Sequence, residues 1–329
     1  MSTINAVLCT VQYEQAMLDK ISSAFSPAKV YFYKPRDSEG IRSVIQKVDV
    51  AVLDGDLNDL ILEGKNLKWI HCSHSGLTKS ARKELFDRNI ILTGAAGRSA
   101  PSLAEHALFF ALSFVYDVYR LHDAQKEHNQ EQIKRQYENS RGLNGKTMGI
   151  IGYGNTGQAL AKRAKALDMR VLVYSRSVRD KQDFVDEYYS MDKGDNYNAL
   201  LPECDYLVLC CHLSDETYHM IGEKQFTMMK NTAVLINMAR GGVVDEKALI
   251  KALKDKTIAG AGCDVFDQEP LPPESPLWDL PNIMITPHMT PRVPSIYGNA
   301  LNILLDNIER YKKGESMRNR LSERDMFTK

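Results

Sequence analysis

The sequence predicts an α/β protein whose strands form parallel sheets. Short apolar runs bounded by Gly, Pro, Asp or Asn alternate along the chain with longer amphipathic stretches. Short apolar runs are typical of strands that are buried on both faces, and their alternation with helix-length segments indicates repeated βαβ units. The chain has 329 residues, which is enough for about two domains with a hydrophobic core each.

The apolar runs fall into two series of expected strands. The first series comprises Ile4–Cys9, Lys29–Tyr33, Val48–Leu53, Leu67–Cys72 and Ile90–Thr93. The second series comprises Thr147–Gly152, Arg170–Tyr174, Tyr206–Cys211, Ala233–Asn237, Ile258–Asp264 and Ile283–Thr286. Because parallel strands need crossover connections of helix length, we expect most of the intervening stretches to be helices that cover the sheets.

A long helix is predicted between the two series. Pro101 suits the first turn of a helix and Ala104–Leu121 is strongly apolar, so we expect a buried helix at a junction between domains. Gln125–Arg141 is almost wholly polar and is expected to form an exposed arm or loop, with a contact between subunits as one use for it. Val293–Lys313 predicts a last helix, which Gly314 ends.

The composition excludes several classes of protein. Lys plus Arg and Asp plus Glu each number 42, and this balance argues against a protein that binds nucleic acid or an anionic membrane surface. No apolar run approaches the ~20 residues that a membrane-spanning helix needs. The start of the chain lacks a basic segment followed by an apolar one, so we expect a cytoplasmic protein. The six cysteines form no CxxC pair and no zinc spacing with histidines, which predicts buried free thiols and no metal.

A glycine motif follows the first strand of the second series. The motif is Gly152-Tyr153-Gly154-Asn155-Thr156-Gly157. The first glycine suits a tight turn, the second lets the backbone approach a pyrophosphate, and the third lets a helix pack closely on the strand. Three spaced glycines alone are weak evidence, and a glycine turn in another α/β protein is the alternative. Because a strand precedes the motif and a helix-like segment follows it, we expect a dinucleotide-binding loop.

The end of the next strand indicates which dinucleotide binds. In such folds an Asp or Glu about 20 residues after the glycines binds the ribose 2′-hydroxyl. Ser175, Arg176 and Ser177 occupy this place, and the first acid is Asp180. A carboxylate would repel a 2′-phosphate, whereas hydroxyls and a guanidinium can bind it. The sequence therefore predicts NADP as the preferred cofactor and NAD as the alternative, with a merely solvated basic turn as the competing interpretation.

Three polar residues follow late strands of the second series. Arg240, Glu269 and His288 come after the runs that end at Asn237, Asp264 and Thr286. Carboxyl ends of parallel strands meet at one edge of a sheet, where ligands bind. A histidine can protonate a ketone oxygen, a carboxylate can orient that histidine, and an arginine can bind a substrate carboxylate. Each residue taken alone has an ordinary structural explanation, but together they predict a site for reducing a 2-keto acid.

Several motifs resemble the D-isomer-specific 2-hydroxyacid dehydrogenase family, and the resemblance extends over nearly the whole chain. The motifs are Leu103-Ala-Glu105-His106, Asn237-Met-Ala-Arg240-Gly-Gly-Val-Val-Asp245, Gly262-Cys-Asp264-Val-Phe-Asp-Gln-Glu269-Pro270 and Thr286-Pro287-His288. The resemblance implies a two-domain architecture in which a Rossmann domain is inserted in a smaller, flavodoxin-like substrate domain. We expect residues 101–291 to bind the dinucleotide and residues 1–100 and 292–329 to bind substrate. It also implies a homodimer joined through the cofactor domains.

The resemblance assigns roles to individual residues. Arg240, Glu269 and His288 become the catalytic trio, and Asp264 is expected to bind the nicotinamide carboxamide. Backbone N–H groups of Ser75, Gly76 and Leu77 are expected to hold the substrate carboxylate, with side chains of Arg240 and His288 beside it. The further residues that we expect to contact the cofactor are Cys211, His212, Thr217, Met238 and Ala239, together with Arg240 and His288.

The sequence departs from the family pattern at a few positions. Ser175 replaces the usual acid, as in NADPH-using glyoxylate and hydroxypyruvate reductases, and His212 stands where the family typically has Pro. Arg292 either reaches a second anionic group of the substrate or faces solvent, and we favour solvent because charged side chains are mostly exposed. His74 and His106 are interpreted as loop and packing residues.

The main hypothesis is NADPH-linked reduction of a small 2-keto acid, such as glyoxylate or hydroxypyruvate, to the D-2-hydroxy acid. A reductase of a larger, branched or aromatic keto acid is the enzymatic alternative. A nucleotide-sensing interaction protein on the same fold is the alternative from another class. Substitution of His288 distinguishes the two classes, because only an enzyme would lose turnover while it kept cofactor binding.

Overall fold

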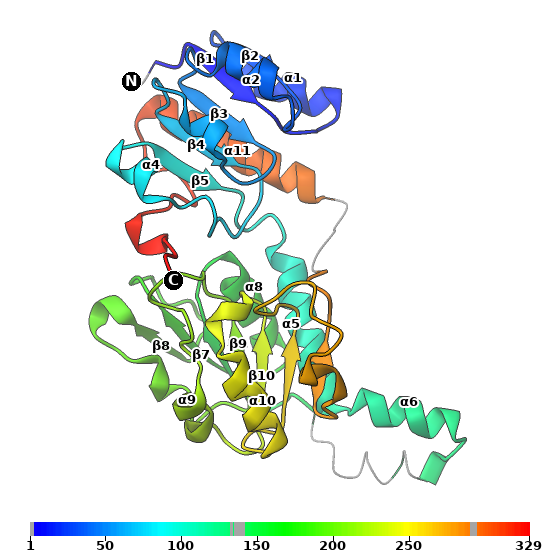
Figure 1. Ribbon diagram of the computed structural model, residues 1–329. Helices are drawn as coiled ribbons and strands as arrows, with labels where there is room; N and C mark the ends of the chain where they lie inside the picture. The colour runs from blue at the N-terminus through cyan, green and yellow to red at the C-terminus, as the bar shows by residue number, and fades with distance from the viewer. Residues whose placement is uncertain (1–2, 132–133, 135–141, 290–294) are drawn as a thin grey trace. The chain divides into compact units, whose positions relative to one another are not determined.

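The computed structural model describes residues 3–131, 134, 142–289 and 295–329 (Figure 1). The chain divides into two compact units, and each is built on a parallel sheet. Unit 1 contains Met1–Ser99, Leu213–Glu216 and Arg292–Lys329, and unit 2 contains Ala100–His212 and Thr217–Pro291. The predicted α/β class with parallel sheets is therefore confirmed.

Unit 1 contains a five-stranded sheet with the order β2-β1-β3-β4-β5. Its strands are β1 (Ala6–Cys9), β2 (Lys29–Phe32), β3 (Val50–Leu53), β4 (Trp69–Cys72) and β5 (Ile91–Gly94). Its helices are α1 (Gln15–Phe25), α2 (Ser38–Val44), α3 (Asp59–Leu62), α4 (Lys83–Asp87) and α11 (Ile296–Lys313), with a 3-10 turn at Glu323–Asp325. Alternate strand residues contribute to two apolar clusters, one of which contains the inner face of α11. The central strands are thus buried on both faces, because a layer of helices covers each side.

Unit 2 contains a seven-stranded sheet with the order β12-β11-β10-β9-β6-β7-β8. Its strands are β6 (Thr147–Ile151), β7 (Arg170–Ser175), β8 (Glu187–Ser190), β9 (Tyr206–Leu209), β10 (Val234–Asn237), β11 (Gly260–Cys263) and β12 (Ile283–Ile285). Its helices are α5 (Ala100–Val115), α6 (Val118–Lys126), α8 (Asn155–Ala166), α9 (Glu223–Met228) and α10 (Glu246–Lys254). Short 3-10 turns lie at Met191–Lys193, Tyr197–Ala199, Gly241–Val243 and Pro276–Asp279.

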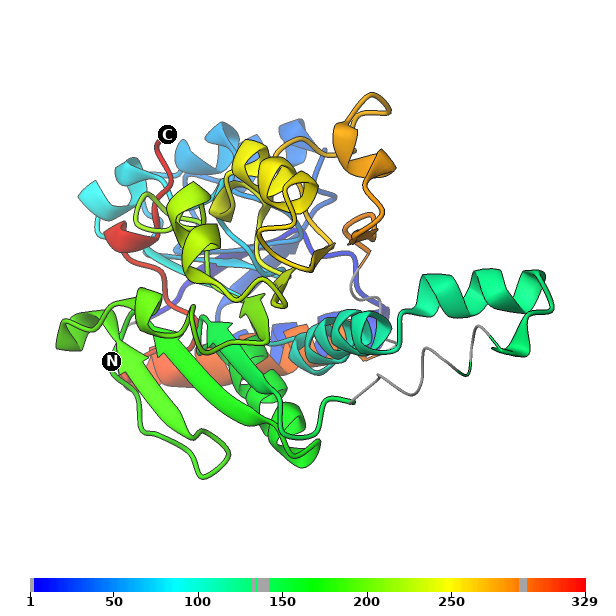
Figure 2. The same cartoon turned by 90° about the horizontal axis from the view of Figure 1, so that it is seen from below.

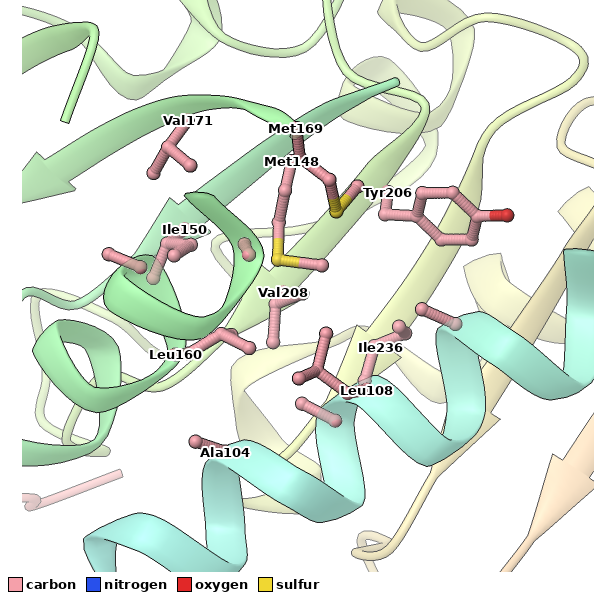
Figure 3. Close-up of a cluster of buried hydrophobic side chains, with 14 of the residues drawn as sticks. Ala104, Leu108, Met148, Ile150, Leu160, Met169, Val171, Tyr206, Val208 and Ile236 are labelled. Carbon is pink, nitrogen blue, oxygen red and sulfur yellow. The ribbon is translucent and has the colours of Figure 1, made fainter. Parts of the chain in front are cut away.

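The core of unit 2 lies between its sheet and the helices α5 and α8. Figure 3 shows Ala104 and Leu108 of α5 directed toward side chains of the strands, among them Val208 and Ile236. Small residues bring α5 close to the sheet: a Cβ added to Gly262 in β11 would lie 2.5 Å from the ring of Phe110. This close packing explains why the side of α5 that faces the sheet is apolar and rich in small residues.

Two predictions about elements near the domain junction are wrong in detail. Ala104–Leu121 is not one buried helix: α5 ends at Val115 and α6 begins at Val118, with Asp117 at a φ of 47° between them. The outer face of α5 is also open, with Phe109 47% exposed. Figure 2 shows α6 extending away from the sheet of unit 2. Most of the polar stretch predicted as an arm or loop, residues 132–133 and 135–141, lies outside the described residues.

Edge strands depart from the predicted pattern. β8 was not expected, because Glu187-Tyr-Tyr-Ser190 has no apolar run, yet it pairs with β7 at the edge of the sheet. β2 was expected to be buried on both faces, but its residues are exposed or half-buried because it is also an edge strand. An edge strand has a neighbour on one side only and so needs less apolar surface.

Candidate active site

The glycine loop joins β6 to α8 with little spare room on its inner side. Gly152 has a φ of 105°, and a Cβ added there would lie 2.6 Å from the backbone of Cys210. A Cβ on Gly157 would lie 2.0 Å from the carbonyl oxygen of Gly152, so the helix packs directly on the turn. A Cβ on Gly154 would meet no atom within 4 Å. The loop thus has an open side at the N-terminus of α8, where free N–H groups and the helix dipole suit a pyrophosphate.

Ser175, at the end of β7, does not present its hydroxyl to solvent. The residue is 5% exposed, and its Oγ donates to the carbonyl oxygen of Ser177 at 2.6 Å and lies 2.6 Å from the Tyr188 hydroxyl. Tyr188 also donates to the same carbonyl at 2.8 Å. Ser175 therefore holds the following turn in place, while Arg176 is half-buried and Ser177 is exposed. Sequence reasoning missed Tyr188, because β8 was not expected.

Tyr153, the second residue of the motif, is buried beside the same turn. Its ring packs edge-on against Tyr188, with centroids 5.8 Å apart. Its hydroxyl is buried and has no hydrogen-bond partner among the described residues. Burial raises the pKa of Tyr153, while Arg179 acts on it in the opposite direction. The Tyr153 side chain therefore places a hydroxyl without a partner among the described residues beside the turn that follows β7.

The structure brings His288 and Glu269 together. Nδ1 of His288 lies 2.7 Å from Oε2 of Glu269, and the side chains are 41% and 34% exposed. The other carboxylate oxygen, Oε1, accepts a hydrogen bond of 3.0 Å from the backbone N–H of Phe266. The carboxylate is thus held from both sides, and it fixes which ring nitrogen faces it. Nε2 is the imidazole nitrogen that remains for a reacting oxygen, since no described residue bonds it.

Asp264 anchors the segment that carries His288. This carboxylate is 2% exposed, and its Oδ1 accepts hydrogen bonds from the Thr286 hydroxyl at 2.6 Å and the Met289 N–H at 3.2 Å. The His106 Nε2 lies 3.2 Å from the same hydroxyl. These contacts flank His288 on both sides, and its φ of 48° is strained for a residue with a side chain. Asp264 therefore positions the histidine, a role that sequence reasoning did not assign to it.

His106 is the packing residue that the sequence suggested. Its ring stacks on Phe110 with centroids 4.7 Å apart, and burial lowers its pKa despite the opposing charge of Asp264. A neutral imidazole can donate one N–H to Thr286, whose own proton goes to Asp264. Sequence reasoning did not find this chain of hydrogen bonds, because its members are up to 180 residues apart.

Arg240 lies after β10, the strand next to β11. The residue is half-buried, and its Nη1 donates to the carbonyl oxygen of Ala239 at 2.7 Å. Asn237 holds the turn, because its amide accepts from Ala239 N–H and donates to the Arg240 carbonyl. A Cβ on Gly241 would lie 2.0 Å from the Phe266 backbone, so the Arg240 turn packs against the turn that leads to Glu269. The three predicted residues thus follow three neighbouring strands, β10, β11 and β12.

The other expected cofactor residues lie on the loops after β9 and β10. Met238 and Ala239 are buried, and Cys211 and His212 are half-buried. The Thr217 hydroxyl donates to the carbonyl oxygen of His212 at 2.6 Å, which closes this loop. Burial raises the pKa of the Cys211 thiol to about 12, so it stays uncharged.

The expected substrate loop lies in unit 1, directly after β4. Gly76 has a φ of 77°, a conformation that favours glycine, and Leu77 is buried in the core. His74 places Nδ1 3.1 Å from the Ser75 carbonyl of its own loop and Nε2 3.5 Å from Asp56 of the segment after β3. Arg292 lies outside the described residues, and neither interpretation of it is tested.

The described ranges offer neither a membrane span nor a metal cluster. No helix in the described ranges is long and apolar enough to cross a membrane. Within the same ranges, no group of three or more His, Cys, Asp or Glu residues is arranged to hold a metal ion.

Comparison with known proteins identifies the family. Residues 108–290 match the family model described as D-isomer specific 2-hydroxyacid dehydrogenase, NAD binding domain. The matched span contains the glycine loop, Arg240 and the His288–Glu269 pair. The chain therefore belongs to the D-isomer specific 2-hydroxyacid dehydrogenase family.

Individual relatives agree with this assignment. A glyoxylate reductase from Korarchaeum cryptofilum is 45% identical over 175 residues, which are 52% of this chain and 50% of that protein, so the match spans about half of the relative. A D-isomer specific 2-hydroxyacid dehydrogenase from Xanthobacter autotrophicus, solved with NADPH and MES, is 25% identical with a TM-score of 0.80, covering 98% of this chain and 99% of that one. An NADPH-dependent glyoxylate/hydroxypyruvate reductase from Sinorhizobium meliloti, solved with NADP and sulfate, has the same fold: it is 23% identical, with a TM-score of 0.76 and coverages of 97% and 98%.

Proposed function

We propose that this protein is an NADPH-preferring reductase that converts a small 2-keto acid, such as glyoxylate or hydroxypyruvate, into the D-2-hydroxy acid. The observation that carries the proposal is the pair of His288 and Glu269 at 2.7 Å, beyond the strand ends of a family NAD-binding domain. An exposed imidazole held by a carboxylate suits proton transfer to a ketone. The substrate class is supported by the glyoxylate reductases among the relatives.

Reduction of the ketone needs a hydride, a proton and groups that hold the substrate. A bound nicotinamide cofactor supplies the hydride. His288 donates the proton at Nε2 to the oxygen of the ketone, and Glu269 keeps the imidazole oriented through Nδ1. Arg240 binds the substrate carboxylate and polarises the carbonyl next to it, because a guanidinium offers several N–H donors in one plane. Backbone N–H groups of the loop Ser75–Leu77 would also bind the substrate carboxylate. Unit 1 would thus bind the substrate and unit 2 the cofactor.

The preference for NADPH rests on the turn after β7. The position that usually carries an acid holds Ser175, which is buried and uncharged, so no carboxylate repels a 2′-phosphate there. Arg176 and Arg179 are the cations of the turn, and Arg179 is exposed. NADH then remains a slower alternative, because a turn with hydroxyls and cations does not exclude a 2′-hydroxyl.

We also propose that the protein acts as a homodimer joined through unit 2. The outer faces of α5 and α6 expose large apolar side chains that would be covered by a second copy. These residues are Phe109, Leu112, Tyr116, Val118 and Tyr119. Light scattering on the purified protein tests this: a dimer mass is expected, and replacement of Phe109 and Tyr119 by Glu should give a monomer.

The experiment that tests the function is a substrate panel. Purified protein is mixed with NADPH or NADH and with 2-keto acids from glyoxylate to phenylpyruvate, and cofactor absorbance is followed. We expect faster turnover with NADPH than with NADH, and faster turnover of small acids such as glyoxylate and hydroxypyruvate than of branched or aromatic ones. Turnover of aromatic acids alone would favour the alternative substrate class. Tight cofactor binding without oxidation by any acid would support a nucleotide-sensing protein.

A further inference from the structure

Polar side chains gather at the carboxyl edge of the unit 1 sheet, and the proposed mechanism does not use them. Tyr13 lies on the loop after β1, Asp54 follows β3 directly, Ser73 follows β4 directly, and Arg98 lies on the segment after β5. Tyr297, in the first turn of α11, packs edge-on against Tyr13 with ring centroids 5.6 Å apart. The carboxyl edge of a parallel sheet is where ligands bind in such folds.

Ser73 is held by two of these residues. The Tyr13 hydroxyl is hydrogen-bonded to Ser73 Oγ, and Nη1 of Arg98 donates to the Ser73 carbonyl oxygen. Arg98 is itself fixed, because Asn299 donates to its carbonyl oxygen at 2.9 Å. Ser73 is two positions before Ser75, where the substrate loop begins. The guanidinium and the phenol therefore lie beside the loop proposed to hold the substrate carboxylate.

Arg98 carries a buried donor that the protein does not satisfy. Its Nε is inaccessible to solvent and has no hydrogen-bond partner among the described residues. No carboxylate in the described ranges lies within ion-pair distance of the guanidinium, and Asp54 acts on it only at longer range. Burial lowers the pKa of Arg98, while Tyr13, Tyr297 and Asp54 oppose this shift. An unsatisfied buried donor is costly, and the residue as a whole is only half-buried, so a hydrogen-bond acceptor is expected at the open part of the guanidinium.

The charges of this cluster of polar side chains, Arg98 and Asp54, indicate which kind of acceptor fits. A second carboxylate on the substrate would gain from Arg98 but would be repelled by Asp54. A hydroxyl group can accept from the guanidinium or the Tyr13 phenol and can also donate its own proton to an oxygen of the cluster. In a 3-hydroxy-2-keto acid the hydroxyl carbon is separated from the carboxylate only by the keto carbon, so both ends can be bound at once.

We propose that Arg98 and Tyr13 are specificity-determining residues that bind a hydroxyl group on carbon 3 of the 2-keto acid. The inference rests on the proposed function and narrows it. The preferred substrate is then a 3-hydroxy-2-keto acid of the hydroxypyruvate type, ahead of glyoxylate, pyruvate and larger apolar keto acids. A site for an apolar chain would not place a guanidinium and a phenol at this edge.

The test compares hydroxypyruvate with pyruvate, which differ by one hydroxyl. The ratio of their kcat/KM values, measured with the same cofactor, should be high in the wild type. Tyr13→Phe and Arg98→Met should each lower this ratio about tenfold, the loss expected when one hydrogen bond to the substrate is removed. Arg98→Lys, which keeps a charged donor, should recover part of the ratio.

Two control variants remove similar groups elsewhere in unit 1. Tyr33→Phe removes a hydroxyl that lies 3.4 Å from Ser43 Oγ, and Arg88→Met removes a guanidinium that donates to the carbonyl oxygens of Leu62 and Gly64. Neither should change the ratio, even where stability falls. A merely structural role for Arg98 and Tyr13 would lower both kcat/KM values in parallel.

The outcomes separate the inference from the proposed function. If the ratio of the kcat/KM values for hydroxypyruvate and pyruvate is unchanged in Tyr13→Phe and Arg98→Met, the inference is wrong. Turnover of a 2-keto acid by these variants would still support the proposed reductase. If Arg98→Met does not fold, Tyr13→Phe decides by itself. Preference of the wild type for oxaloacetate over hydroxypyruvate also overturns the inference, because it would assign the cluster to an anion. Failure to reduce any 2-keto acid would remove the proposed function and the inference together.

Discussion

His71 in unit 1 and His288 in unit 2 both lie near the carboxyl end of a parallel strand, yet their environments differ completely. His71 is fully buried, with Nδ1 2.9 Å from the Thr93 hydroxyl, and burial lowers its pKa to about 3. His288 is 41% exposed and is bound to the carboxylate of Glu269. His71 therefore stays neutral and supports the core, whereas His288 is open to solvent and is held by an anion. Position on a strand does not decide the role of a histidine; solvent access and the bonded partner do.

The largest effect expected from this comparison is at His288. Replacement by Asn keeps a polar side chain but removes the acid, so kcat for a 2-keto acid should fall about a thousandfold, within the range for general acid catalysis. Cofactor binding, measured by quenching of protein fluorescence, should be retained. The exposed residue His122 provides the control, since His122→Asn should leave kcat unchanged. A wild-type rate in His288→Asn would remove the proposed mechanism.

A second substitution tests the cofactor end of the same sheet. Ser175→Asp restores the acid that usually ends this strand, and its charge would oppose a 2′-phosphate. The ratio of kcat/KM for NADPH to that for NADH should fall about a hundredfold, since like charges in contact cost several kcal/mol. The fraction of the protein that is active affects both kcat/KM values equally, so it does not change their ratio. Ser23→Asp, on the exposed side of α1, should not alter the ratio, and an equal ratio in both variants would contradict the NADPH preference.

Removal of the charge beside His288 should have a smaller effect. Glu269→Gln keeps an oxygen for the Phe266 N–H but no longer provides an anion for the imidazole. We expect kcat to fall between about tenfold and a hundredfold, as for other partners that orient a reacting group. Glu274→Gln, on the same long loop and exposed, is the matched control. Steady-state kinetics that show no loss of kcat would mean that Glu269 does not orient the catalytic imidazole.

The buried histidine should affect stability but not chemistry. The ordinary pKa of a histidine is 6.5, and that of folded His71 is about 3. As the pH falls below 6.5 the unfolded chain takes up a proton that the folded chain does not, so stability is lost progressively toward pH 3. Between about pH 7 and about pH 5 the wild type should lose roughly 2 kcal/mol more than His71→Gln.

Urea unfolding followed by tryptophan fluorescence measures this difference. Trp69 reports on the site directly, because its indole Nε1 donates to the same Thr93 hydroxyl at 2.8 Å. His122→Gln, which changes an exposed histidine, should keep the pH dependence of the wild type. Equal pH dependence in His71→Gln and the wild type would show that His71 is protonated in the folded protein, against the contrast drawn with His288.

The expected strands were predictable because their signal is local. Each predicted run coincides with an observed strand to within about two residues at its ends, since short apolar runs in an α/β protein are mostly buried strands. β8 could not be predicted, because Glu187-Tyr-Tyr-Ser190 joins the sheet only through pairing with β7. The break at Asp117 was equally hidden, because no Gly or Pro marks the boundary between α5 and α6, and the two helices part at a single left-handed residue.

The candidate site likewise has features that the sequence predicts and features that only the folded structure shows. The sequence by itself determined which residue types stand at the strand ends, namely the three glycines, Arg240, Glu269 and His288, because glycine conformations and strand endings leave a local pattern. Tertiary structure alone decided that Ser175 turns its hydroxyl inward, that Asp264 anchors the His288 segment, and that Arg98 meets Ser73. These contacts depend on which side chains the sheet brings together and on which atoms lose solvent. Residues far apart in the chain acquire those properties only when it folds.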